Sequence, residues 1–265
     1  LPNAEVAYFN TKADLISALL TNKIDAYTVD EPVIKTQMRQ DDRLAYIPEY
    51  MESFDFAYVF PKTDEGQVLC DQFSEYLTAI RADGTMEAIE AKWFGDDDSQ
   101  KTLADYSAFP APNGKLSMAT EAMYEPFSYI ANNGIVGYDI DIAVGFCEAY
   151  GYGLEIVDMS FDAVLPSVQS GKCDFGGAGI TITDERRESV LFSEPNFSGG
   201  TVLAVLKDGA ATAQAGGYTS LDQLDGARIG VQTGTTFDEI VLEALPDAQI
   251  SYFNSYPDMA AALEA

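Results

Sequence analysis

The two ends of the chain carry the same motif, and this repeat constrains how the chain folds. Its opening segment, 1–21 (LPNAEVAYFNTKADLISALLT), aligns with its closing segment, 245–265 (LPDAQISYFNSYPDMAAALEA), at a constant offset of 244, with 9 of 21 positions identical. Such self-similarity indicates an array of similar modules. We interpret the chain as a tandem-repeat piece cut out of register. Because two copies cannot fill one place in a fold, we expect one to pair within its own chain. The other would be redundant or displaced, or would pair with a neighbour, as in domain swapping.

The charge balance excludes several classes of function. The chain has 43 Asp and Glu residues against 15 Lys and Arg residues and no His, for a net charge of −28. A field this negative repels nucleic acid and anionic membrane surfaces. Without His, there is no Ser-His-Asp or Cys-His catalytic unit and no His-ligated zinc or haem. We expect no cofactor, no metal and no catalytic residue.

The three cysteines, Cys70, Cys147 and Cys173, are an odd number without CxxC spacing. That pattern indicates neither a disulfide framework nor a thiolate metal site. We expect buried free thiols.

Strand and helix signals alternate along the chain, which predicts an α/β fold with largely parallel sheets. No apolar run approaches the roughly 20 residues that a membrane helix needs. We expect no signal peptide in this sequence, and because it opens without Met we interpret it as an excised fragment. The acidic stretch at 96–113 contains Pro110 and Pro112 and is flanked by Gly95 and Gly114, a pattern that predicts a linker. Pro166 is expected near the first turn of its helix, where a missing N–H is tolerated.

Two Gly- and Thr-rich segments have the character of strand-to-helix turns. They are GGAGITITDERR at 176–187 and GVQTGTTFDE at 230–239. Glycine lets a backbone approach a ligand, and the amides that open a helix favour an anion. Neither segment matches a nucleotide-phosphate fingerprint. A carboxylate is therefore the better candidate ligand, although such a turn is also a common connection in α/β folds.

Several longer segments resemble one family. These include TEAMYEPFSY, GYDIDIA, LPSVQSGKCDFGGAGITITDERRESVLFSEP, SLDQLDGARIGVQTGTT and RADGTMEAIEAKWFG. They are similar to the solute-binding proteins of polar amino-acid ABC transporters. The resemblance implies a two-lobed Venus-flytrap fold of the type II periplasmic-binding-protein class, which captures a free L-amino acid, polar or basic. It also implies an extracytoplasmic location, periplasmic or anchored at the cell surface, and a membrane ABC permease as partner.

The order of the segments differs from that of the family. In the family, the counterpart of 114–265 comes first and that of 1–95 follows, so this chain is permuted. If the family's division into lobes is carried over to this chain, lobe I comprises 60–200, including the linker. Lobe II is then assembled from 1–59 and 201–265. The duplicated ends, 1–21 and 245–265, would then compete for one strand–helix place in lobe II.

The resemblance also assigns roles at the two ends of an amino-acid ligand. Arg186 would clamp the α-carboxylate, a task that suits the planar guanidinium fork. Asp30 would bind the ammonium. The rest of the carboxylate cradle would come from the two Gly- and Thr-rich turns, at Gly179, Thr181, Gly234, Thr235 and Thr236.

Each of these two roles has an alternative. Arg186 could form a surface ion pair with Asp184 or Glu188. Asp30 could cap the helix that follows it.

The remaining site assignments concern the ligand side chain. The family positions for aromatic walls are Tyr124 and Phe161, with core packing as the competing account. Glu121 matches a position where some relatives carry an acidic group that contacts a cationic side chain. That would favour Arg, Lys or ornithine, although a neutral ligand such as Gln stays open.

Three other functions fit the same resemblance. One is a ligand-sensing Venus-flytrap domain of a membrane receptor. Another is an enzyme similar to cyclohexadienyl dehydratases, in which Glu121 or Glu125 would act as the acid. The last is a structural repeat with an inactive pocket.

Overall fold

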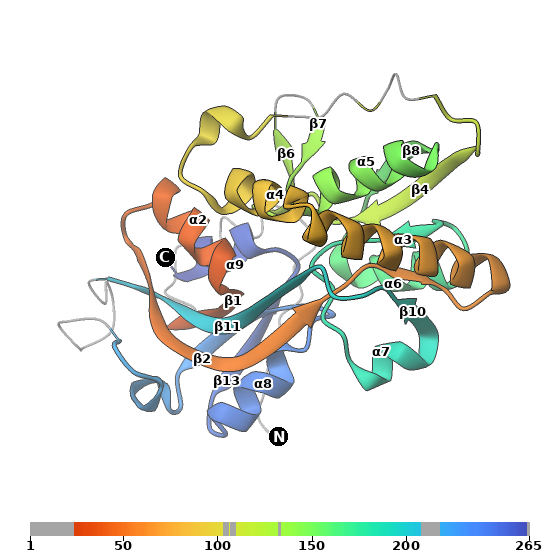
Figure 1. The fold of residues 1–265 in the computed structure, drawn as a ribbon. Helices are drawn as coiled ribbons and strands as arrows, with labels where there is room; N and C mark the ends of the chain where they lie inside the picture. Colours follow the sequence, from red (N-terminus) through yellow and green to blue (C-terminus); the bar gives the residue numbers. More distant parts are fainter. Residues whose placement is uncertain (1–23, 103–105, 107–109, 132–133, 208–217, 264–265) are drawn as a thin grey trace. The chain divides into compact units, whose positions relative to one another are not determined.

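The chain divides into two compact units. The computed structural model describes residues 24–102, 106, 110–131, 134–207 and 218–263. Unit 1 comprises 1–53 and 199–265, and unit 2 comprises 54–198. Figure 1 shows the elements of both units, and each unit is described by itself below. The assignment of the units to the lobes of a flytrap stays a prediction.

The residues of unit 1 that the structure describes form a five-stranded sheet. Its strands, in spatial order, are β13 (Gln249–Phe253), β12 (Arg228–Gln232), β1 (Ala26–Asp30), β11 (Phe197–Leu206) and β2 (Leu44–Phe56). β13, β12 and β1 run parallel, and β11 is antiparallel to β1. Its helices are α2 (Glu31–Gln40), α8 (Phe237–Ala244) and α9 (Tyr256–Leu263), with a 3-10 turn, η2 (Leu221–Leu224). Strands β1 and β12 are almost wholly buried, as expected for the centre of a sheet covered on both faces.

The parallel strands of unit 1 bring two candidate segments to one edge. Tyr27 of β1 lies opposite Gly230 of β12 in the register. Asp30 ends β1, and residues 233–236 connect β12 to α8. Because parallel strands end on the same side of a sheet, Asp30 and this turn lie at the same carboxyl edge, where ligands of α/β folds bind.

The closing copy of the duplicated segment fills a place in unit 1. Strand β13 pairs in parallel with β12 over five residues, and α9 packs against β1 (Figure 1). Leu245, Met259 and Leu263 of this copy are buried. The opening copy, 1–21, lies outside the described residues.

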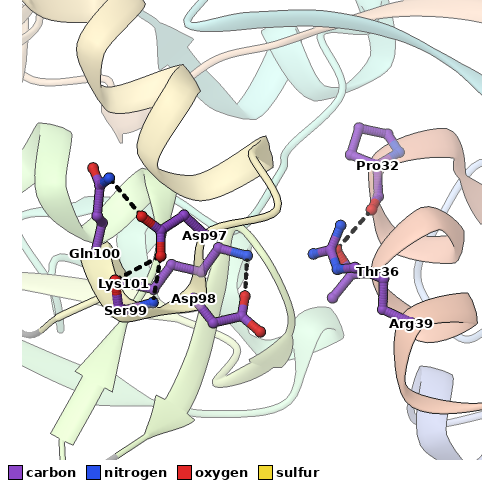
Figure 2. Close-up of polar contacts among 8 residues, drawn as sticks. All are labelled: Pro32, Thr36, Arg39, Asp97, Asp98, Ser99, Gln100 and Lys101. Carbon is purple, nitrogen blue, oxygen red and sulfur yellow. Dashed lines mark hydrogen bonds and ion pairs between the residues drawn. The ribbon is translucent and has the colours of Figure 1, made fainter.

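Helix α2 begins directly after β1 and carries a proline in its first turn. Pro32 fits there because the N–H that it lacks has no intrahelical partner at a helix start. Its carbonyl oxygen accepts from Thr36 Oγ1 at 3.1 Å, and Arg39 Nη2 donates to the same hydroxyl at 3.1 Å (Figure 2). Thr36 thus connects the first turn of this helix to Arg39 in its last turn.

The described part of unit 2 contains two sheets. The larger has the spatial order β10 (Val190–Phe192), β3 (Val59–Pro61), β9 (Phe175–Gly176), β4 (Lys115–Thr120) and β8 (Gly153–Asp158). The smaller is made of β5 (Met123–Tyr124), β6 (Ser128–Ala131) and β7 (Gly134–Val136). The helices that the structure describes in this unit are α3 (Asp64–Ala82), α4 (Thr85–Phe94), α5 (Tyr138–Tyr150), α6 (Phe161–Gln169) and α7 (Asp184–Ser189). The prediction of an α/β fold is confirmed, although both large sheets also contain antiparallel pairs.

The core of unit 2 is aromatic. Helix α3 is capped by Thr63, whose side chain accepts from the Gly66 amide. Phe73 of this helix is fully buried and lies with its ring centroid 4.3 Å from that of Tyr58 and 4.6 Å from that of Phe146. Burial of one such side chain contributes about 1.5–3 kcal/mol to stability.

Pro166 lies in the interior of its helix, so its predicted place in the first turn was wrong. It is the sixth residue of α6, which runs from Phe161 to Gln169. A proline there leaves the carbonyl four residues earlier without its helical partner. Because Val164 and Val168 are fully buried in the apolar cluster of unit 2, tertiary packing keeps the segment helical.

The acidic stretch predicted as a linker contains an ordered polar turn. Asp97 accepts from the Ser99 amide at 3.1 Å and from Gln100 Nε2 at 2.8 Å, which closes the 3-10 turn η1 (Asp98–Gln100). Lys101 Nζ pairs with Asp98 at 2.7 Å (Figure 2). Part of the predicted linker therefore has a defined conformation, and 103–105 and 107–109 lie outside the described residues.

The cysteines are buried free thiols, which confirms that prediction. Burial raises the pKa of Cys147 to about 12 and that of Cys70 to about 11. In the described ranges, no helix has the length and apolar character needed to cross a bilayer. No cluster of three His, Cys, Asp or Glu residues that could hold a metal ion occurs among the residues described.

Candidate functional site

Arg186 is oriented by a backbone carbonyl and an aromatic face. Helix α7 starts after Thr183, whose Oγ1 accepts from the Arg186 amide at 3.1 Å. The guanidinium Nη1 donates to the Thr181 carbonyl oxygen at 2.9 Å, and the guanidinium carbon lies 5.7 Å from the centroid of the Phe161 ring. Burial lowers the pKa of Arg186 from its usual value, although the group stays charged at neutral pH. The structure thus brings together three residues that the resemblance assigned to one site.

Gly179 packs against an aromatic wall where no other residue would fit. Its φ is +60°, and a Cβ there would lie 2.4 Å from Tyr124 Cε1 and 3.1 Å from Phe56 Cε2. The ring of Tyr124 stacks on that of Phe127, with centroids 4.9 Å apart and planes at 13°. The Gly-rich loop and Tyr124 are therefore neighbours, as a pocket wall requires.

Phe161 serves the core as well as the candidate site. It begins α6 and lies in an apolar cluster with Val164 and Ile180, with 7% of its surface exposed. One ring therefore packs in the core while it supports Arg186. The two accounts of Phe161 are compatible.

Asp139 is a polar residue of this site that the sequence reasoning missed. Its Oδ2 accepts from the Gly179 amide at 3.0 Å, and its Oδ1 accepts from Asn196 Nδ2 at 3.0 Å. Burial raises the pKa of Asp139 to about 7, and both hydrogen bonds oppose that rise. A signal existed in the sequence, because a carboxylate stands among apolar residues at the start of the predicted helix, in GYDIDIA.

The bond to Asp139 changes what Gly179 can offer a ligand. We expected its backbone to help cradle a carboxylate, which needs an N–H donor. That N–H instead donates to Asp139. The carbonyl oxygen is the backbone group that Gly179 can present. A carbonyl oxygen accepts from an ammonium, but it cannot bond a carboxylate, which is itself an acceptor.

Glu121 is buried just after β4. It is 1% exposed, and its main-chain oxygen accepts from Ser128 Oγ at 2.7 Å. The Gly177 amide donates to the Ala119 carbonyl oxygen at 3.0 Å. This bond joins the end of β4 to the start of the Gly-rich loop. Glu121 is therefore close in the chain to this junction. Glu125, the other carboxylate considered, follows Tyr124 in the adjoining turn.

In unit 1, Asp30 occupies the N-cap position of α2 without acting as a cap. Its backbone is extended, and its side chain makes no capping hydrogen bond to α2, all of which is described. Asp30 is 2% exposed, and its Oδ2 accepts from Tyr256 Oη at 3.5 Å. The helix-cap alternative therefore lacks its defining contact.

The turn after β12 is closed by its own threonine. Gly234 has a φ of +81°, in the left-handed region that favours glycine. Thr235 Oγ1 donates to the Gln232 carbonyl oxygen at 2.8 Å and accepts from the Phe237 amide at 3.3 Å. Thr236 is the N-cap residue of α8. Thr235 therefore shapes this turn through its hydroxyl, and Thr236 stands at the helix start, where an anion is favoured.

The candidate residues thus form two groups. In unit 2, contacts connect Tyr124, Phe161, Gly179, Thr181 and Arg186. In unit 1, Asp30 and residues 234–236 share the carboxyl edge of the sheet.

Comparison with curated proteins identifies several binding proteins as relatives. The chain is 31% identical over 155 residues to the ABC transporter arginine-binding protein 1 of Escherichia coli, covering 58% of this chain and 60% of that protein. It is 33% identical over 133 residues to the arginine-binding extracellular protein ArtP of Bacillus subtilis, covering 50% and 49%. It is 30% identical over 131 residues to the histidine-binding periplasmic protein of Salmonella typhimurium, covering 49% and 48%. The chain thus spans between about half and 60% of the length of these relatives.

A solved structure agrees with these matches. The crystal structure of the ancestral amino acid-binding protein AncCDT-1, described as a precursor of cyclohexadienyl dehydratase, aligns with a TM-score of 0.51 and 33% identity, covering 57% of this chain and 66% of that one. The family of bacterial extracellular solute-binding proteins, family 3, matches residues 116–249, which is half of the chain. The chain belongs to the bacterial extracellular solute-binding proteins of family 3, with their type II periplasmic-binding-protein fold.

Proposed function

We propose that the chain captures a free L-amino acid outside the cytoplasm for an ABC importer, without chemical change to the ligand. One observation carries the proposal: the guanidinium of Arg186 is held by the Thr181 carbonyl over the Phe161 ring. A planar guanidinium binds a carboxylate with two parallel hydrogen bonds, and a guanidinium fixed beforehand loses less entropy on binding. Membership of an extracellular solute-binding family supports the same function.

The other end of the ligand is assigned to unit 1. We propose that Asp30 binds the ammonium and that Thr236, at the start of α8, faces the carboxylate. The carboxyl-edge position of both residues supports this assignment. In the two-lobed fold that the resemblance implies, the lobes would close around the zwitterion. Ligand would shift the open form towards the closed one because only the closed form makes both sets of contacts.

The ligand class proposed is a polar or basic amino acid. The relatives named for arginine or histidine binding support a basic side chain, and the buried carboxylate of Glu121 is suited to one. Glutamine is the neutral alternative. The partner that reads the closed form would be an ABC permease or, in the sensing alternative, a membrane receptor.

A thermal-shift screen tests the function. We expect one or more of the twenty L-amino acids, ornithine and citrulline to raise the melting temperature, because a ligand that binds the folded state stabilises it. Arg186→Ala should abolish that rise. If no compound raises the melting temperature, the proposal is contradicted. If Arg186→Ala shows the same rise as the unmodified chain, the pocket at Arg186 does not bind the ligand, which favours the structural repeat with an inactive pocket.

Incubation with prephenate and arogenate separates a binding protein from an enzyme. The relatives compared above are named as binding proteins, which supports the absence of turnover. The dehydratase alternative is motivated by the description of the aligned ancestral protein as an enzyme precursor. Formation of phenylpyruvate or phenylalanine would decide for that alternative.

We also propose that the closing copy of the repeat holds its place in unit 1 and that the opening copy can exchange for it, within one chain or from a neighbour. Most buried positions of the closing copy have similar residues in the opening one. The pairs are Leu245 and Leu1, Ala248 and Ala4, Met259 and Leu15, Ala262 and Ala18, and Leu263 and Leu19. Tyr256 is an exception, since Lys12 is its counterpart. The permuted order of the segments remains part of this proposal.

A further inference from the structure

The buried carboxylate of Asp139 accepts two hydrogen bonds from residues outside its own helix. Asp139 is the second residue of α5 and 1% exposed. Its carboxylate accepts from the Gly179 amide and from the Asn196 side chain, each at 3.0 Å. A buried carboxylate is costly unless it is hydrogen-bonded, and an apolar residue would satisfy the helix equally well. The two bonds are therefore what this carboxylate contributes.

The bond to Gly179 fixes the start of the candidate ligand loop. Gly179 is held on one side by this bond and on the other by the ring of Tyr124. Ile180, the next residue, is bonded to the segment around Phe56, because its carbonyl oxygen accepts from the Ala57 amide at 3.1 Å. Thr181 then accepts from Arg186. A short series of contacts thus connects Asp139 to the guanidinium.

The bond to Asn196 also connects Asp139 to Thr181, through Phe56. The Asn196 amide donates to the Phe56 carbonyl oxygen at 2.8 Å, and Phe56 forms an isolated β-bridge with Thr181. Each oxygen of the Asp139 carboxylate is therefore connected to Thr181, one through Gly179 and the other through Asn196 and Phe56. A displacement of Asp139 would act on that backbone from two sides.

We infer that Asp139 is a positioning residue of the amino-acid site, which holds the Gly179 amide and thereby keeps Thr181 and Arg186 in their binding arrangement. The inference rests on the proposed function, since it assigns Asp139 a part in ligand binding without ligand contact. It differs from a purely structural role because it requires the strength of the Gly179 bond to govern affinity.

The charge of Asp139 offers a way to vary that bond. The Gly179 N–H is always a donor, whereas the Asn196 amide can turn to present its oxygen. When Asp139 takes up a proton at Oδ1, Asn196 can therefore adapt, and the bond from Gly179 becomes a weaker, uncharged one.

The titration of Asp139 should be measurable near neutral pH, because few other groups titrate in that range. Burial raises the pKa of Asp139 to about 7. Among the described residues, two ionisable groups interact electrostatically with Asp139, namely Tyr58, whose Oη donates to the Asp139 carbonyl oxygen at 2.6 Å, and Tyr138. Burial raises the pKa of both tyrosines. The chain contains no histidine that would titrate in the same range.

Amide hydrogen exchange of the ligand-free protein tests the hold on the loop. Asp139→Asn keeps the shape but removes the charge, so we expect exchange at Gly179 to become roughly tenfold faster at constant pH, as for the loss of about 1.4 kcal/mol. Asp141→Asn is the matched control, because Asp141 lies on the same helix and accepts instead from Trp93 Nε1 at 2.8 Å. It should leave Gly179 unchanged. Equal exchange in Asp139→Asn and the unmodified chain overturns the inference.

Calorimetric titration with L-arginine and L-glutamine from pH 5.5 to 8.5 tests the effect on binding. The unmodified chain and Asp141→Asn should bind about tenfold more tightly at the alkaline end, as a stronger charged bond implies. Asp139→Asn should bind at the weak acidic value throughout. Faster exchange with unchanged affinity would make Asp139 merely structural and overturn the inference.

The two measurements also separate this inference from the proposed function. If the unmodified chain binds neither amino acid, and the wider screen is also silent, the proposed function fails and so does the role in binding. If the chain binds but Asp139→Asn retains the pH profile of the unmodified chain, the inference alone fails.

Discussion

Arg186 donates from Nη1 to the main-chain oxygen of Thr181 at 2.9 Å, five residues earlier in the chain. Because the acceptor belongs to the backbone, the position of the guanidinium depends on the conformation of the Gly-rich loop as well as on the Phe161 ring. A long side chain that is already oriented loses less conformational freedom when it binds a ligand. This relationship makes the loop and Arg186 a single functional unit.

Replacement of Arg186 should abolish amino-acid binding. We expect Arg186→Ala to weaken affinity for L-arginine at least about a hundredfold, and Arg186→Lys to recover little, because an ammonium cannot form the paired bonds of a guanidinium. Arg187→Ala is the matched control, since Arg187 is exposed and lies over the Phe192 ring. Calorimetry on the three variants measures this. Equal losses in the Arg186→Ala and Arg187→Ala variants would contradict a specific clamp.

The aromatic face beneath Arg186 should contribute to affinity separately from core packing. Phe161→Leu keeps an apolar side chain but removes the ring, and we expect binding about two- to fivefold weaker, in line with a cation–π contribution of roughly 0.5–1 kcal/mol. Phe192→Leu removes the corresponding ring under Arg187, at the same 5.7 Å separation. That control should change stability but not affinity. Two variants with indistinguishable affinities would show that the ring acts through packing alone.

The sequence predicted local architecture better than contacts. The Gly and Thr pattern predicted a turn between β9 and α7 and another between β12 and α8, and both are present. Turns are readable because glycine and threonine act locally. The position of Pro166 was misjudged because buried neighbours, rather than its own propensity, decide where that helix runs.

The site itself was readable only in part. The role of Arg186 came from the resemblance, since spacing alone does not place a guanidinium over a distant ring. Asp139 and Gly179 are 40 residues apart, and their bond depends on how α5 packs beside the loop. No local pattern encodes such a contact. The hydroxyl of Thr235 likewise serves its own turn, which residue type alone does not reveal.

The stability of the fold should depend on the charge of Asp139. Burial raises its pKa from 3.8 to about 7, so between these values the folded state keeps a proton that the unfolded state has released. The free energy of unfolding should therefore fall as pH rises through this window, by about 1.4 kcal/mol per pH unit. Asp139→Asn should lack this loss. Denaturant unfolding at pH 4, 5.5, 7 and 8.5 measures it, with Asp141→Asn as control, and parallel profiles for all three proteins would refute the assignment.

Asp30 should be needed for ligands that carry an ammonium. We expect Asp30→Asn to weaken L-arginine binding about a hundredfold, since a charged hydrogen bond with a buried carboxylate contributes about 1.5–3 kcal/mol. Tyr256→Phe is the control, because it removes only the hydroxyl 3.5 Å from Asp30 Oδ2 and should change affinity a few-fold at most. The same titrations provide the measurement. Unaltered affinity in Asp30→Asn would remove Asp30 from the site.

The duplicated ends should respond differently to the same kind of substitution. Met259 is fully buried in α9, so Met259→Ala should lower the free energy of unfolding by about 2–5 kcal/mol. Leu15 is its counterpart in the opening copy. If the closing copy holds the place beside β12, Leu15→Ala alone should change stability by less than about 0.5 kcal/mol. Denaturant unfolding of both variants compares the two copies, and a larger loss from Leu15→Ala would show that the opening copy holds the place instead.

The double variant tests exchange between the copies. Once Met259→Ala has weakened the closing copy, the opening copy can enter its place, and Leu15 then becomes important for stability. The Met259→Ala and Leu15→Ala substitutions together should therefore cost more than the sum of the single losses, a coupling that a double-mutant cycle measures. If the entering copy comes from a neighbouring chain, the stability of Met259→Ala should also rise with protein concentration, because association stabilises by mass action. Additive losses that are independent of concentration would mean that the opening copy never takes this place.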